Sequence, residues 1–242
     1  MIKRAHKTLK RFASDTSGTT LTELAIVIPL LLLIVMGTIE FGRLGYNTTM
    51  VQQATEYGAR TAAVRPPICD GVPDTIAGGS SSTSTTPPKA GSLCKSGGSG
   101  TICATVAPVA CPLSAPGTST TARTTAQERA DAAQEIWNAI SPLLPNRTTA
   151  DNSITAANVW VRYEQDPRIG FLSGPYTPVV TVEVVQVEDG RLERLDYSFI
   201  TPLGQLAELA ILGGPSGIRN SFKFPVMSSS MPGEDLGNGT GS

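Results

Sequence analysis

The sequence predicts an α+β protein, in which a long N-terminal transmembrane helix continues into a small domain with an antiparallel sheet and one or two helices. Two observations lead to this fold class. Residues 24–39 form the only long apolar run and carry no charged side chain. Beyond about residue 124, one segment with helical periodicity precedes several segments that alternate apolar and polar residues, as strands do.

The apolar run is long enough to cross a bilayer. A spanning helix needs about 20 mostly apolar residues, and Leu21–Ile39 nearly supplies them, with Glu23 as the exception. Each Leu, Ile or Val favours insertion by roughly 0.3–0.6 kcal/mol, whereas a carboxylate at the centre costs about 3 kcal/mol and less near an end. Insertion is therefore favoured, and the position of Glu23 calls for a functional explanation.

Basic residues before the run set its orientation. They are Lys3, Arg4, Lys7, Lys10 and Arg11. Positive residues beside a membrane segment stay in the cytoplasm, so we expect a cytoplasmic N-terminus, with everything after about Glu40 across the membrane. A cleaved secretory signal is the alternative, but Gly37–Arg43 offers no small-x-small cleavage site.

The helix should extend well beyond the membrane. Residues 40–64 contain no Pro and keep helical spacing, and Arg65-Pro66-Pro67 ends them because a residue before Pro is pushed out of the α region. At 1.5 Å per residue, a helix over 20–64 would be about 65 Å long. Pro29 removes one helical hydrogen bond and should kink or loosen the helix.

A basic leader, a Gly, four residues, a Glu and an apolar helix are the pattern of class III signal peptides in type IV pilins and pseudopilins. The wider stretch resembles the TadE-like proteins of tight-adherence (Flp) pilus systems. The resemblance rests on Gly18–Ala25, Pro29–Leu32 and Gly37–Arg43, and continues more loosely over Ala54–Arg60. It covers about a quarter of the chain.

The resemblance implies a protein of the bacterial inner membrane whose C-terminal domain lies in the periplasm, with roles in processing and assembly. A prepilin peptidase would cut between Gly18 and Thr19, and Glu23 would then meet the new α-amino group of a neighbouring subunit. Leu24 departs from the Tyr that Flp-type prepilins often carry there, and an uncleaved single-pass anchor is the alternative. Packing against pilin or TadE/TadF-like subunits would use Glu23, Pro29, Gly37, Glu40, Gly42 and Arg43.

The cysteines predict disulfides. All four, Cys69, Cys94, Cys103 and Cys111, lie beyond the membrane segment, where an oxidising compartment favours two bridges. Three connectivities are allowed, and the sequence selects none. A zinc site is disfavoured because no pair has C-x2-C spacing and no His lies nearby. The surrounding Ser/Thr/Gly/Pro-rich segment should be unable to order itself.

The exported domain should begin with a helix. Thr125-Ala126-Gln127-Glu128 has capping-box form, and Ser141-Pro142 should end the helix. A stripe of apolar side chains follows helical spacing and is expected to pack on the sheet or on the long helix. Its members are Ala126, Ala130, Ala133, Trp137 and Ile140.

Strands are expected over 158–164, 178–188, 191–199 and 222–226, in a sheet of about four strands. Asp189-Gly190 predicts a hairpin turn, and the alternation slips near Val185, which indicates a bulge or strong twist. Residues 203–212 should form a short helix. The tail from Ser228 is expected to be disordered.

The sequence contains almost no residue pattern that would support catalysis or metal binding. The one histidine, His6, lies in the leader, which excludes His-based triads and His-ligated metals from the exported domain. A net charge of −1 gives no polycation for nucleic acid. We therefore expect no enzyme activity, cofactor or metal.

The expected regions are a cytoplasmic leader (1–18), the membrane and extended helix (19–65), a Cys-containing loop (66–122), an α+β domain (123–227) and a tail (228–242). The favoured function is a minor pilin or pseudopilin, in the inner membrane or, within a pilus, outside the cell. The alternative is a membrane-anchored binding module or adhesin outside the filament.

Overall fold

The computed structural model describes residues 17–79, 89–94, 102–121, 124–145, 154–166, 168–188, 191–201 and 221–233. The chain divides into two units, one formed by Met1–Gly45 with Ser198–Phe222 and the other by Tyr46–Tyr197 with Lys223–Ser242. The α+β class is confirmed. The expected helix over 203–212 lies outside the described residues.

The N-terminal helix α2 runs from Ser17 to Ala63 without interruption and contains Pro29. Its end agrees with the position expected from Arg65-Pro66-Pro67. The last third of α2 belongs to the second unit and buries small residues, among them Ala54, Ala59 and Ala62. Small side chains allow close packing here: a Cβ added at Gly58 would lie 3.1 Å from Val182 and 3.2 Å from Ile140.

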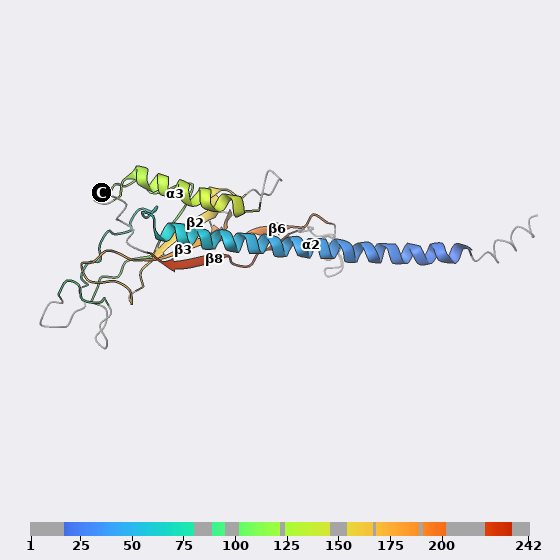
Figure 1. Cartoon of the computed structure of the whole chain (residues 1–242), viewed down its shortest axis with the longest axis horizontal. Helices are drawn as coiled ribbons and strands as arrows, with labels where there is room; N and C mark the ends of the chain where they lie inside the picture. The colour runs from blue at the N-terminus through green and yellow to red at the C-terminus, as the bar shows by residue number, and fades with distance from the viewer. Residues whose placement is uncertain are drawn as a thin grey trace, which may run out of the picture. The chain divides into compact units, whose positions relative to one another are not determined.

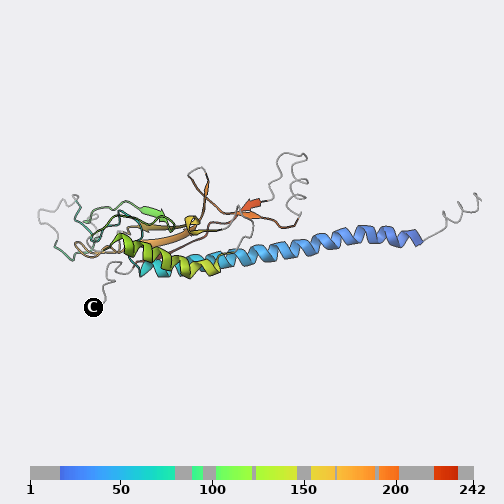
Figure 2. The same ribbon diagram turned by 90° about the horizontal axis from the view of Figure 1, so that it is seen from above.

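Helix α3 covers Ala126–Ile140 and begins with the expected capping box between Thr125 and Glu128. It lies beside the last third of α2, over the same face of the sheet (Figures 1 and 2). The predicted stripe was partly wrong. The helix buries Arg129, Ala132, Ala133, Ile136 and Ile140, whereas Ala126, Ala130 and Trp137 are only half-buried. A short 3-10 turn, η1 (Ser141–Leu143), follows α3.

The main sheet is antiparallel, with strand order β1-β2-β3-β8. Its strands are β1 (Val109–Pro112), β2 (Val159–Glu164), β3 (Val179–Val184) and β8 (Ser228–Pro232). A second 3-10 turn, η2 (Ala156–Asn158), leads into β2. Val161 lies opposite Val182, both fully buried, as the alternation of β2 predicts.

Both outer strands of this sheet differ from the expected ones. The Cys-containing segment, expected not to order itself, supplies β1, because its Cys111 pairs in register with Val161 and is cross-linked to Cys69. Ser228, expected to open a disordered tail, begins β8. The serine-rich β8 has little intrinsic preference for a strand, and its pairing with β3 determines its conformation.

The segments expected to complete the main sheet form two separate two-stranded sheets instead. The chain leaves the main sheet at Val185, where the alternation slips, and β4 (Gln186–Glu188) then pairs with β5 (Arg191–Glu193). Strands β6 (Asp196–Ser198) and β7 (Ser221–Lys223) form the other two-stranded sheet. Phe224 is buried, as the expected strand over 222–226 predicts. Val226 was expected on the same buried side but is exposed, and its neighbour Met227 is buried instead.

Candidate functional site

The first half of α2 exposes apolar side chains on every side. Among its large residues, all those from Leu21 to Met36 and also Ile39 are exposed. Within the described residues, one helix is long and apolar enough to cross a membrane, Leu21–Ala63, and its most apolar part is hardly buried. An exposed apolar surface of this extent is typical of surfaces that contact lipid or other helices.

The residues expected to be processed lie at the start of this helix. The backbone at Gly18 and Thr19 belongs to the first turn of α2, which begins at Ser17. Glu23 lies one turn further on and is exposed. Its carboxylate is therefore on the surface of the apolar segment, where a neighbouring chain could reach it.

The small residues expected at subunit contacts lie further along the helix. Gly37 is half-exposed and Gly42 is exposed. A Cβ added at Gly42, or at Gly45 one turn later, would meet no atom within 4 Å. This part of α2 therefore has open space beside it, which close helix packing in lipid requires.

Glu40 and Arg43, also expected at subunit contacts, interact within their own unit. Glu40 is 3% exposed. Its carboxylate accepts hydrogen bonds from the backbone N–H groups of Ile200, at 3.3 Å, and Thr201, at 3.2 Å. Arg43 lies 3.5 Å from the same carboxylate. A buried carboxylate is costly unless it is hydrogen-bonded, and these three groups satisfy it.

The structure pairs the four cysteines and resolves the connectivity. Cys69 joins Cys111, which we call the long-range disulfide, and Cys94 joins Cys103, the short-range disulfide. The long-range disulfide connects the chain after α2 to β1. The short-range disulfide closes a loop beside Gly79, where an added Cβ would lie 2.9 Å from the Cys103 carbonyl oxygen.

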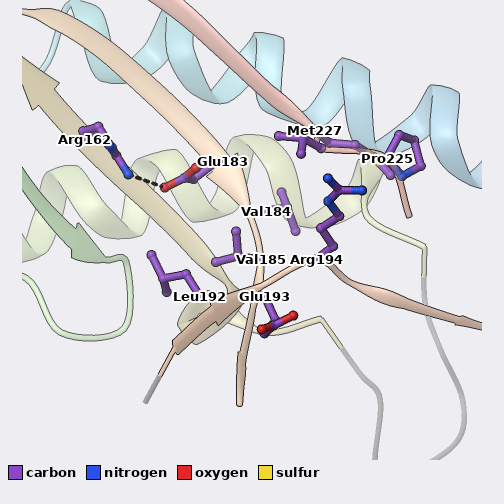
Figure 3. A pocket seen from close by; sticks show the side chains of 10 residues that line it. Arg162, Glu183, Val184, Val185, Leu192, Glu193, Arg194, Pro225 and Met227 are labelled. Carbon is purple, nitrogen blue, oxygen red and sulfur yellow. Dashed lines mark hydrogen bonds and ion pairs between the residues drawn. The ribbon is translucent and has the colours of Figure 1, made fainter. Parts of the chain in front are cut away.

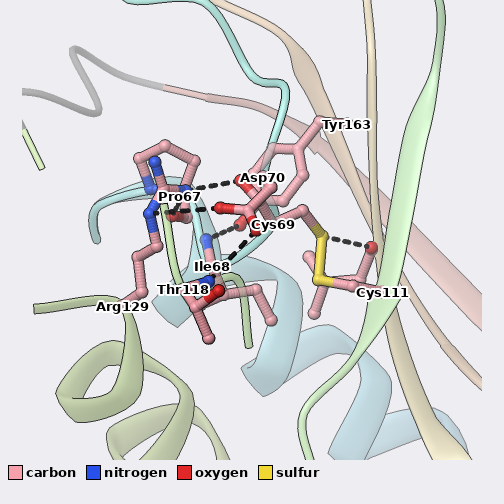
Figure 4. Close-up of a disulfide and its surroundings, with 9 residues drawn as sticks. Pro67, Ile68, Cys69, Asp70, Cys111, Thr118, Arg129 and Tyr163 are labelled. Atoms are coloured by element: carbon pink, nitrogen blue, oxygen red, sulfur yellow. Dashed lines mark hydrogen bonds and ion pairs between the residues drawn. A yellow bond between two sulfur atoms is a disulfide. The ribbon is translucent and has the colours of Figure 1, made fainter. Parts of the chain in front are cut away.

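A buried arginine stabilises the chain around the long-range disulfide (Figure 4). Arg129 of α3 is fully buried. Its guanidinium donates to the backbone carbonyls of Pro67, at 2.9 Å, Ser119, at 3.2 Å, and Cys69. Arg129 and the three carbonyl groups form a cluster that connects the segment after α2 to α3. Arg129 was not among the residues predicted for the buried stripe, although its spacing from Ala133, Ile136 and Ile140 places it on the same side of α3.

Two ionisable groups complete the cluster. Partial burial acts to raise the pKa of Asp70, but the N–H groups of Ser119 and Thr118 and the nearby Arg129 together hold that pKa below its ordinary value. Burial raises the pKa of Tyr163, so its hydroxyl stays neutral and accepts the N–H of Ile68 at 3.1 Å. These groups hold the fold together and resemble no catalytic arrangement.

A groove of about 300 Å³ opens between the end of β3, β5 and residues 225–227 (Figure 3). Val184 and Met227 contribute apolar atoms. Arg162 and Glu183 face each other across 3.5 Å. The hydrogen bond from Lys223, at 2.6 Å, holds the pKa of Glu193 below its ordinary value. Both carboxylates of the groove thus have cationic partners within the chain.

Among the described residues, no three His, Cys, Asp or Glu side chains gather as they would to hold a metal ion. No curated protein and no solved structure matches the chain. One family model does match, and it does so on the helix just described. The resemblance expected from the sequence is thereby confirmed: residues 18–60 match the model of the TadE-like protein family.

Proposed function

We propose that this chain is a non-enzymatic structural or assembly component of a tight-adherence pilus, a minor pilin or pseudopilin inserted through α2. The observation that carries the proposal is that the matched residues 18–60 include the whole exposed apolar segment of α2. A helix that is apolar all round and unburied by its own chain is suited to lipid and to the helices of other subunits.

The leader and Glu23 are given roles by this proposal. The basic residues hold the N-terminus in the cytoplasm, and the exported domain lies in the periplasm. A prepilin peptidase cuts after Gly18, and the Glu23 carboxylate pairs with the α-amino group of an adjacent subunit. Such pairing supports the proposal physically, because a carboxylate in hydrocarbon is tolerated when it has a cationic partner.

Glu23→Ala tests the role of the carboxylate. We expect the variant to insert in the membrane normally and to abolish or strongly reduce surface pili in cells that lack the wild-type protein. Glu56→Ala is the matched control, because Glu56 is an exposed carboxylate on the same helix that pairs with Arg60 of its own chain. Normal pili with Glu23→Ala would refute the assembly role.

The alternative is a membrane-anchored binding module, and the groove between β3, β5 and residues 225–227 is the feature that favours it. A module of this kind would capture its ligand without entering a filament. Val226→Asp would place a charge at this exposed position of the groove. If it abolished surface adhesion while pili remained normal, the binding module would be preferred.

A further inference from the structure

Glu40 lies where the hydrocarbon part of a membrane would end. Residues 24–39 are uncharged, and about 20 helical residues cross a hydrocarbon core of about 30 Å. Glu40 is the first charged residue after this run. Because the Cα–Cβ bonds of a helix tilt toward its N-terminus, the carboxylate lies on the membrane side of its own Cα.

The carboxylate fixes the position of a distant chain segment at that boundary. The backbone N–H groups of Ile200 and Thr201 donate to its two oxygens. Hydrogen bonds to a charged acceptor are stronger than neutral ones, and the 3% exposure of Glu40 keeps water from competing. A segment 160 residues further along the chain is therefore held within about one helical turn of the end of the apolar run.

The segment presents an apolar side chain at this depth. Ile200 is 75% exposed, and the two helical neighbours of Glu40, Ile39 and Phe41, are 61% and 73% exposed. A single exposed isoleucine is ordinary on a protein surface. Here, however, the isoleucine is held by its own backbone N–H beside a helix surface that is already apolar. An exposed apolar side chain is thus held near the end of the apolar surface of α2.

We propose that residues 199–201 form a second membrane contact, in which Ile200 inserts into the outer interface of the bilayer that α2 spans, held there by Glu40. The occupant of this surface is lipid, because Ile200 is held at the end of the apolar segment of α2 that spans the bilayer. The contact would fix the depth and rotation of α2 in the membrane. This inference rests on the proposed function only in requiring that α2 span the bilayer.

The test measures depth in full-length protein reconstituted in phosphatidylcholine–phosphatidylglycerol vesicles. A nitroxide is attached at Ile200→Cys, and its collisions with oxygen, which concentrates in lipid, are compared with those of a water-soluble nickel complex. Ile39→Cys is the reference within the membrane segment. Val226→Cys is the matched control, since Val226 is an apolar side chain with 64% exposure in the other unit.

We expect the Ile200 label to resemble the Ile39 label and to be several-fold less accessible to nickel than the Val226 label. In Glu40→Ala the Ile200 label should lose this protection, while Glu40→Gln, which keeps one carbonyl acceptor, should lose part of it. A nickel-accessible Ile200 label beside a lipid-buried Ile39 label would overturn the inference and leave membrane insertion intact.

The remaining outcomes are equally decisive. A nickel-accessible Ile39 label would refute the proposed insertion itself. Protection of the Ile200 label that persists in Glu40→Ala would refute the claim that Glu40 holds this segment at the membrane. If Glu40→Ala fails to fold, the Ile200 label in the otherwise unchanged protein still decides whether the segment contacts lipid.

Discussion

Arg129→Met should strongly destabilise the exported domain. The substitution keeps most of the side-chain volume but removes every donor from a fully buried position. Three backbone carbonyls, those of Pro67, Cys69 and Ser119, lose their Arg129 donor. Leaving a buried polar group unsatisfied costs about 1–3 kcal/mol. Local rearrangement and water entry will recover part of the total, so we expect a loss of about 3–5 kcal/mol.

The assay is urea unfolding of the full-length, disulfide-intact protein in detergent, followed by the fluorescence of its two tryptophans, Trp137 and Trp160. Arg65→Met is the matched control, because Arg65 makes a half-exposed ion pair with Glu135 of α3. Pairs of this kind contribute about 0–1 kcal/mol. An Arg129→Met protein within about 1 kcal/mol of wild type would refute the reasoning, since the cluster would then contribute no more than a surface pair.

Three further predictions use the same unfolding assay. Replacing both cysteines of the long-range disulfide by serine should cost more, about 4 kcal/mol, than the same change in the short-range disulfide, about 2.5 kcal/mol, because they span 42 and 9 residues; equal losses would contradict this. Gly58→Val should destabilise by about 1–3 kcal/mol through overpacking, and a stabilised variant would show that the contact at 3.1 Å relaxes freely. The lowered pKa of Asp70 stabilises the fold above the ordinary pKa near 4, and this contribution is lost as the pH falls through the folded pKa. Asp70→Asn should therefore lose less stability than wild type between about pH 5 and pH 2. Parallel plots of unfolding free energy against pH for the two proteins would contradict this.

The elements that the sequence predicted well are those in which local signals agree. The end of α2 follows from the Arg65-Pro66-Pro67 rule, and the start of α3 follows from the capping box at Thr125. In β2 the alternation of apolar and polar residues survives intact because one face of that strand is buried and the other is not. Local chemistry and tertiary burial point the same way in each case.

The elements that the sequence missed depend on partners far along the chain. β1 is an edge strand in a segment rich in Ser, Gly and Pro, and its order comes from the long-range disulfide and from pairing with β2. β8 lacks apolar alternation, and β3 supplies its hydrogen bonds. Neither contact leaves a periodic signal in the sequence.

The burial of Arg129 and the partners of Glu40 within the chain could not be predicted for another reason. A charged residue in a helical stripe is normally counted against burial, and only the structure reveals that backbone carbonyls surround Arg129. For Glu40, the resemblance to TadE-like proteins predicted a contact with another subunit. The structure adds hydrogen bonds to Ile200 and Thr201 of the same chain, which no spacing rule connects with residue 40.

We propose above all that the apolar half of α2 remains in lipid after export, and that cleavage after Gly18 makes Thr19 the N-terminus of the mature protein. The most direct test is the intact mass and N-terminal sequence of the protein, from carbonate-washed membranes and from sheared surface filaments. We predict a membrane-extracted protein that begins at Thr19 and retains the entire apolar segment. A soluble periplasmic protein that begins beyond Ile39 would contradict the claim.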